Sequence, residues 1–166
     1  MNKFKLFSLV ALSGSILFTG CGKDDEESAP EVSPQKLIGK TWKLTALNLN
    51  PAFTDPETGV SYSDLYSDMD ECEKDNTILY HAADVSATSG HILGDEGAEK
   101  CDVDAPQTSE GAWAFANTEK TKLTQTQDGE TVTVDLIEVT NTTMRQRYTD
   151  TFEGTTYTVI ATFSAQ

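Results

Sequence analysis

Three cysteines and two histidines are the side chains of this sequence best suited to metal or sulfur chemistry. Four of them share one segment, with the spacing Cys72-x8-His81-x9-His91-x9-Cys101. Thiolates and imidazoles bind zinc, but structural zinc sites use closely spaced ligand pairs, which this segment lacks. In an exported protein, two such cysteines most simply pair with each other. We therefore expect a Cys72–Cys101 disulfide and no metal site, with zinc as the alternative.

The carboxylates are abundant, with 27 Asp and Glu against 12 Lys and Arg and a net charge of −15. Two carboxylates in a cleft can hydrolyse glycosides, but their abundance removes any specificity from that signal. Neither histidine lies near a plausible nucleophile, and the sequence has no phosphate-binding loop or metalloprotease motif. We therefore expect a protein that is not an enzyme and needs no cofactor. The negative charge also argues against binding nucleic acid or adsorbing to anionic lipid.

The acidic residues are concentrated between Asp64 and Asp104, where twelve carboxylates stand against two lysines. Oxygen-rich loops can hold Ca²⁺, but Asp68-x-Asp70 is not followed by the glycine and bidentate glutamate of an EF-hand. A solvated acidic face is the simpler interpretation, with calcium as an alternative. This segment is the place to look for a cation or a basic partner.

Residues 1–20 are typical of a secretory signal peptide. Lys3 and Lys5 precede an apolar run that is too short for a lasting membrane span. The run ends in Leu17-Phe18-Thr19-Gly20-Cys21, which resembles the lipobox of bacterial lipoproteins. The resemblance implies cleavage before Cys21 and acylation of its thiol, which would anchor the protein to a membrane.

Residues 21–36 join this cysteine to a charged stretch that contains prolines and few apolar residues, a composition that predicts a disordered tether. Within it, Lys23-Asp24-Asp25-Glu26-Glu27 resembles the export signal of Bacteroidota surface lipoproteins. The resemblance implies a location at the outer membrane facing the cell exterior, with the periplasmic face as the alternative.

Residues 37–166 are rich in short runs that alternate apolar and polar residues, the period of half-buried strands. The inward-facing sets are Trp42, Leu44, Ala46; Trp113, Phe115; Val132, Val134, Leu136; and Tyr157, Val159, Ala161, Phe163. Turn signals such as Asp128-Gly129 separate them. The pattern predicts an all-β domain of about eight strands, an antiparallel up-and-down barrel, with one short helix near Tyr62 to Glu71.

Several segments of this domain resemble, in order and spacing, the lipocalin-like lipoproteins of Bacteroidota. They are Leu37-Ile38-Gly39-Lys40-Thr41-Trp42-Lys43-Leu44, Cys72-Glu73-Lys74-Asp75-Asn76, Cys101, Gly111-Ala112-Trp113-Ala114-Phe115, Leu123-Thr124 and Leu136-Ile137-Glu138-Val139-Thr140. The resemblance implies an eight-stranded antiparallel β-barrel of the calycin type, with a cavity or a packed interior.

The first motif departs from the lipocalin signature, since Gly39-x-x-Trp42 replaces Gly-x-Trp. Whether Trp42 plugs the closed end of the barrel is therefore left open. In lipocalins an arginine commonly covers that tryptophan. Arg145 or Arg147 could take this role, although a solvated face is the simpler interpretation for both.

Eight side chains are expected inside the barrel, lining either a ligand cavity or a solid core: Trp42, Leu44, Trp113, Phe115, Val134, Tyr157, Val159 and Phe163. The first functional hypothesis is a lipid-anchored binding protein for a small apolar or amphipathic ligand. The alternative is an accessory protein with a filled barrel whose loops bind another envelope component. The stretch from Pro51 to Tyr66 is expected to be a lid or an aromatic binding surface.

Overall fold

The computed structural model describes residues 32, 34–127 and 129–166, so the expected signal peptide, Cys21 and most of the tether lie outside the described residues. The elements within them are α1 (Pro34–Leu37), β1 (Thr41–Thr54), β2 (Ser61–Asp64), α2 (Leu65–Asp68), α3 (Glu71–Lys74), β3 (Thr77–His81), β4 (Ser89–Asp95), β5 (Thr108–Phe115), β6 (Lys122–Gln127), β7 (Glu130–Val139), β8 (Thr143–Phe152) and β9 (Thr155–Ala165). Among these residues, none of the helices has the length and apolar character needed to span a bilayer.

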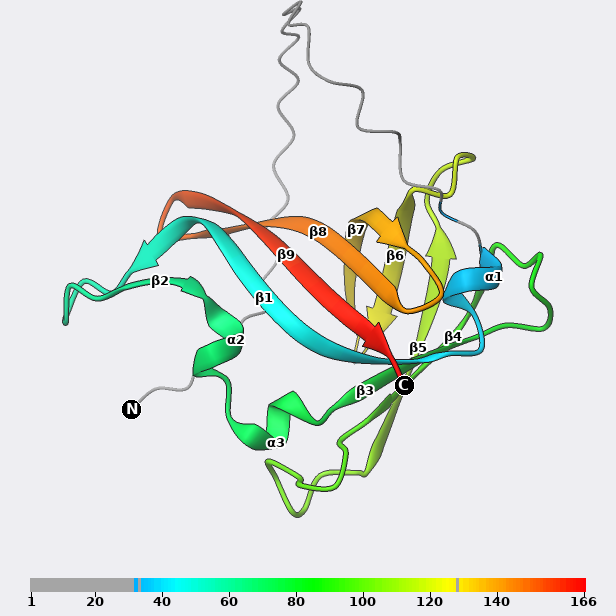
Figure 1. Ribbon diagram of the computed structural model, residues 1–166, viewed down its shortest axis with the longest axis horizontal. Helices are drawn as coiled ribbons and strands as arrows, with labels where there is room; N and C mark the ends of the chain where they lie inside the picture. The colour runs from blue at the N-terminus through cyan, green and yellow to red at the C-terminus, as the bar shows by residue number, and fades with distance from the viewer. Residues whose placement is uncertain (1–31, 33, 128) are drawn as a thin grey trace, which may run out of the picture.

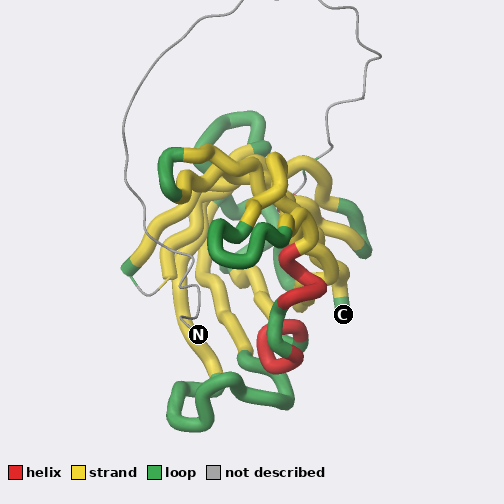
Figure 2. The backbone as a smooth tube through the Cα atoms, turned by 90° about the vertical axis from the view of Figure 1, so that its left-hand side faces the viewer, coloured by secondary structure: helices red, strands yellow, loops and turns green. Residues whose placement is uncertain are grey.

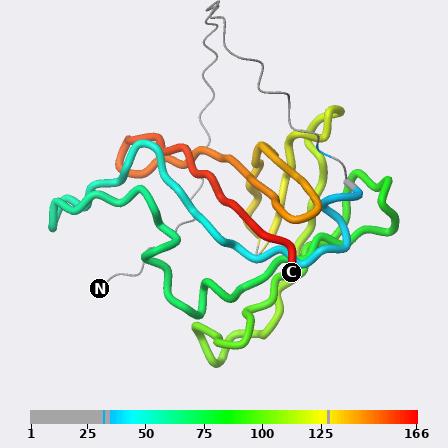
Figure 3. Tube along the Cα trace, in the orientation of Figure 1, coloured from blue at the N-terminus to red at the C-terminus, as the bar shows by residue number. Residues whose placement is uncertain are grey.

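The strands form a closed antiparallel barrel. β1 and β3 to β9 follow one another around it, and β9 pairs back onto β1 over most of their length. The predicted all-β barrel of eight strands is therefore confirmed. In Figure 3 the first and last barrel strands, cyan and red, run side by side.

β2 is a ninth strand that the sequence pattern did not predict. It pairs with the second half of β1, at Phe53↔Tyr62 and Thr54↔Ser61, and so extends a hairpin away from the barrel. Figure 1 shows this hairpin and the β8–β9 hairpin projecting together to one side. The expected single helix near Tyr62 is instead a strand followed by two short helices, α2 and α3.

The period-two pattern correctly identified most of the core, with one exception in β1. A β-bulge between Leu44 and Ala46 shifts the alternation by one residue. Ala46 consequently pairs with Thr162, while Leu47 pairs with the buried Ala161 and packs against the core. The expectation that Ala46 continues the inward face was wrong, because a bulge reverses which side of the strand faces inward.

The two ends of the barrel differ in what covers them. At the closed end lie α1 and the connections 82–88, 116–121 and 140–142. At the opposite end, which we call the mouth, lie the β1–β2 and β8–β9 hairpins, α2, α3 and the 96–107 loop. Figure 2 looks onto the mouth, with α2 and α3 in red beside the strands.

Candidate functional site

The predicted interior side chains divide into two groups by how much of their surface is buried. Trp42, Trp113, Val134, Val159 and Phe163 are buried, with at most 8% of their surface exposed. The other predicted residues, Leu44, Phe115 and Tyr157, are half-buried. The closed half of the barrel is thus filled by side chains, with both tryptophans in one contiguous cluster.

Trp42 closes the barrel despite the extra residue in its motif. Its indole Nε1 donates a hydrogen bond to the Leu37 carbonyl oxygen at 3.1 Å, which ties α1 to the first strand. Gly39 has a φ of +74°, a left-handed conformation that glycine adopts without strain, and its N–H donates to the Tyr80 carbonyl oxygen at 2.9 Å. This turn absorbs the extra residue and brings Trp42 into the core.

The cation beside Trp42 is a lysine. Lys40 Nζ lies 5.8 Å from the centroid of the indole ring. The two arginines form ion pairs on the outer wall instead, Arg145 with Glu138 at 3.9 Å and Arg147 with Asp135 at 3.0 Å. The solvent-facing interpretation of the arginines is therefore confirmed.

A polar triad crosses the middle of the barrel. The Tyr80 hydroxyl of β3 donates to Gln125 Oε1 of β6 at 3.0 Å, Gln125 Nε2 donates to Gln146 Oε1 of β8 at 3.2 Å, and Gln146 Nε2 donates to the Tyr80 hydroxyl at 3.0 Å. Burial raises the pKa of Tyr80 far above its ordinary value. The ring of hydrogen bonds satisfies polar atoms that would otherwise be costly to bury.

An aromatic cluster occupies the inner face of the projecting hairpins at the mouth. The Phe53 ring is its centre, with centroid distances of 6.5 Å to Tyr62, 5.8 Å to Phe152 and 6.4 Å to Tyr157. Tyr62 stacks on Phe53, while the other two rings meet it edge-on, geometries that aromatic rings favour. Phe152 nevertheless keeps 39% of its surface exposed. We call these four residues the aromatic mouth.

Between the triad and the aromatic mouth lies Tyr148, on the same face of β8 as Gln146 and Asp150. Burial, with a contribution from the charge of Asp150, raises the pKa of Tyr148 to about 12. The phenol therefore stays protonated at neutral pH and can donate a hydrogen bond. From closed end to mouth, the interior passes from apolar core to polar floor to half-exposed aromatic rings.

The cysteines are joined at the mouth. Cys72 of α3 and Cys101 of the 96–107 loop form a disulfide with a Cα–Cα distance of 5.2 Å, which confirms the expected pairing. A zinc site built from these two thiolates is therefore contradicted, because disulfide sulfurs are not available as thiolate ligands. The bridge ties together the two mouth loops that carry most of the acidic segment.

Those acidic side chains are largely occupied in shaping the loops. Asp75 Oδ2 accepts the N–H groups of Ala98 and Glu99 at 2.7 and 3.0 Å, and Asp95 Oδ1 accepts Gly97 N–H and Gln107 Nε2–H, both at 2.9 Å. The Gln107 hydrogen bond, then that of Gly97, lowers the pKa of Asp95. Within the described ranges, no group of three His, Cys, Asp or Glu side chains is placed to hold a metal ion.

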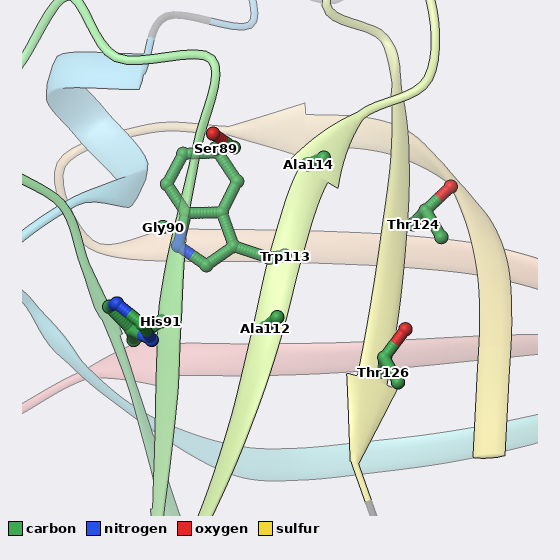
Figure 4. A pocket seen from close by; sticks show the side chains of 8 residues that line it. All are labelled: Ser89, Gly90, His91, Ala112, Trp113, Ala114, Thr124 and Thr126. Carbon is green, nitrogen blue, oxygen red and sulfur yellow. The ribbon is translucent and has the colours of Figure 1, made fainter. Parts of the chain in front are cut away.

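Two depressions lie outside the barrel interior. One, of about 420 Å³, runs over the outer wall of β4, β5 and β6, and Figure 4 shows its lining residues, among them His91, Ala112 and Thr126. The other, of about 390 Å³, lies at the closed end around Asn117 and Lys120. Both are open and shallow.

Sequence reasoning missed Gln125, Gln146 and Phe152. Gln125 lies in the run Leu123-Thr124-Gln125-Thr126-Gln127, where alternating Thr and Gln marks a strand but not which polar set points inward. Gln146 lies between two arginines, a context typical of an exposed strand face. Phe152 comes next to a turn, where period two carries little weight.

Comparison with known proteins gives no further assignment, since no family model and no curated protein matches the chain. The barrel itself is consistent with a calycin-type fold. Its relationship to the lipoproteins of Bacteroidota stays a prediction.

Proposed function

We propose that this protein is a non-catalytic, lipid-anchored binding protein of lipocalin-like architecture, displayed on the outer surface of the outer membrane. Its ligand is a small amphipathic molecule whose apolar part binds at the aromatic mouth. The observation that supports this most is the aromatic cluster around Phe53, placed on the inner face of the barrel end that is not filled by core residues.

The depth profile of the barrel supports an amphipathic ligand over a purely apolar one. The aromatic rings of the mouth offer flat, half-exposed apolar surface. Next to them, Tyr148 and Asp150 place a hydroxyl and a carboxylate on the same inner face. A ligand with an apolar body and a polar group that can hydrogen-bond would match both parts, since small-molecule sites combine apolar lining with a few placed polar groups.

A fluorescence titration of the full chain with N-phenyl-1-naphthylamine, a small amphipathic probe, tests the mouth. We expect Phe152→Ala and Phe53→Ala to weaken binding about tenfold, as expected when a central aromatic contact is lost. Val103→Ala is the matched control, because Val103 is a highly exposed apolar residue (81%) on the 96–107 loop outside the cluster. Equal binding by all three variants would contradict the proposed site.

The anchor is tested separately by labelling cells with an alkyne-tagged fatty acid. Incorporation that depends on Cys21 and is abolished by Cys21→Ala supports lipidation, whereas unchanged labelling contradicts it. Protease accessibility on intact cells then distinguishes the exterior from the periplasmic face.

A second function is favoured by the filled closed half, in which both tryptophans and Tyr80 are fully or almost fully buried. Such a barrel could act as a rigid scaffold that presents its loops to another envelope protein. Native mass spectrometry of the full chain separates the two proposals. A co-purifying small molecule that is lost in Phe53→Ala supports the binding protein, and its absence supports the scaffold.

A further inference from the structure

The two histidines of the chain, which sequence spacing separates by nine residues, are direct neighbours in the barrel wall. His81 at the end of β3 pairs with His91 of β4 in the antiparallel register. Residues opposite each other on adjacent strands share one face, with Cβ atoms about 4.5–5.5 Å apart. Both side chains are exposed, on the outer wall. This is a separation at which two imidazoles can reach one metal ion.

The His81 ring is oriented for ligation by its own surroundings. Its Nδ1 lies 3.2 Å from the Ala82 carbonyl oxygen, and because a carbonyl can only accept, this hydrogen bond forms in the tautomer with the proton on Nδ1. Nε2 is then left with a lone pair directed away from that contact. Histidine ligands of metals commonly have this arrangement, in which a backbone carbonyl fixes the tautomer and the ring orientation.

The backbone beneath the pair is held in place. The Trp113 indole Nε1 donates to the His81 carbonyl oxygen at 3.2 Å. Gly90, next to His91, allows this approach, since a Cβ at this position would lie 2.0 Å from the same oxygen. The strands that carry the two imidazoles are thus fixed by a buried tryptophan.

Space for further ligands lies beside the pair. Across the sheet from His91 comes Ala112, and next to it Thr126, so that the row continues with small side chains along the floor of the 420 Å³ depression. Figure 4 shows this row over three strands. No described carboxylate or cysteine completes a three-ligand set with the histidines, so water or an external donor would occupy the remaining positions.

We infer that His81 and His91 form a two-histidine chelate for a late first-row divalent metal ion on the outer wall of the barrel. Imidazole nitrogen suits Cu²⁺, Ni²⁺ and Zn²⁺, and the general order of affinity makes Cu²⁺ the tightest. His91 lines the depression, which gives room beside the pair for a small carboxylate or imidazole donor as a third ligand. This site is independent of the aromatic mouth, because it lies on the opposite face of the sheet.

The inference is tested by titrating the full chain with CuCl₂, NiCl₂ and ZnCl₂ and measuring the heat of binding by calorimetry. Free thiols are first blocked by alkylation so that they do not bind the metal. We expect one ion per chain and quenching of tryptophan fluorescence by Cu²⁺, because Trp113 contacts the backbone of His81. His81→Asn and His91→Asn should each weaken Cu²⁺ binding by about tenfold or more, since even outer-shell partners of metal ligands contribute 10- to 100-fold.

The two substitutions should be non-additive, so that His81→Asn with His91→Asn binds little worse than either alone. Glu153→Gln, on the remote β8–β9 turn, is the control and should leave the affinity unchanged. Unaltered melting temperatures of the metal-free variants would show that folding is intact, as expected for exposed side chains. Wild-type affinity in the double variant, or in either single variant, would overturn the inference.

Discussion

The closed half and the mouth half of this barrel are built from the same strands but differ in how far side chains fill their interiors. In the closed half, Trp42, Trp113 and their neighbours fill the interior and leave little surface exposed. In the mouth half, inward-facing side chains such as Phe53 and Tyr157 stay half-buried, and a disulfide rather than a core holds the loops. The large buried side chains are concentrated at one end, whereas the other end keeps aromatic surface half-exposed.

The sharpest way to test this division is to remove one large aromatic ring from each half. Trp42→Ala should lower the free energy of unfolding by about 3–5 kcal/mol, because it opens a cavity in a closely packed core. Phe152→Ala should cost only about 0.5 kcal/mol, as for most exposed positions. Urea denaturation measures both. Equal losses would mean that the mouth is part of the core.

The mouth depends instead on its covalent link. Replacing both Cys72 and Cys101 with serine should cost about 3–4 kcal/mol, because the bridge closes a loop with a sequence separation of 29 residues. Amide hydrogen exchange should show the loss of protection first in α3 and the 96–107 loop. Loss of protection spread evenly over β5 to β8 would contradict the division into halves.

The polar triad lies at the boundary between the halves. Its contribution to the free energy of unfolding is tested by removing one member and then all three. Gln146→Leu should cost about 1–3 kcal/mol, because it leaves the Tyr80 hydroxyl and the Gln125 amide with fewer partners. Adding Tyr80→Phe and Gln125→Leu should restore much of the loss, since no buried polar atom is then left without a partner. If the triple variant were less stable than Gln146→Leu, the triad would stabilise the fold by more than the pairing of its own buried polar atoms.

Alkaline pH should destabilise the fold through Tyr148, which lies between the triad and the aromatic mouth. Because the folded-state pKa of Tyr148 is raised from 10.0 to about 12, its contribution to stability is complete below pH 10 and is lost as the pH rises toward 12. Melting temperatures should therefore fall over this window, and less steeply in Tyr148→Phe. An identical slope in this variant would show that Tyr148 does not contribute.

The smallest effect is expected on the outer wall. The hydrogen bond from Lys122 lowers the pKa of Asp135 below its ordinary value of 3.8, and that from Arg147 adds to the effect, while partial burial opposes both. The resulting stability is present above that value and is lost as the pH falls below it. Asp135→Asn should cost less than about 1 kcal/mol at neutral pH, and still less in high salt. A larger cost would place this ion pair among the determinants of the fold.

The barrel and its antiparallel order could be predicted because the alternation of apolar and polar residues is a local pattern. The disulfide could be predicted because the domain has few cysteines, which leaves few possible pairings. It predicted the closed half better than the mouth. Trp42 and Trp113 could be assigned to the interior from their residue type and their place in the alternating pattern. The burial of Gln125 and Gln146 depends instead on which polar face of a strand turns inward. The pairing of His81 with His91 depends on strand register, which no local pattern encodes.

The seam between β1 and β9 has a consequence for how the protein is made. Trp42 lies opposite Ala165 and Leu44 opposite Phe163, so the first barrel strand completes its pairing only when the last strand is present. During synthesis, every shorter chain exposes unpaired strand edges, which are templates for aggregation. Proteins that depend on contacts between residues so distant in sequence also fold slowly. The emerging chain must therefore be kept apart from its copies until its final eleven-residue strand arrives.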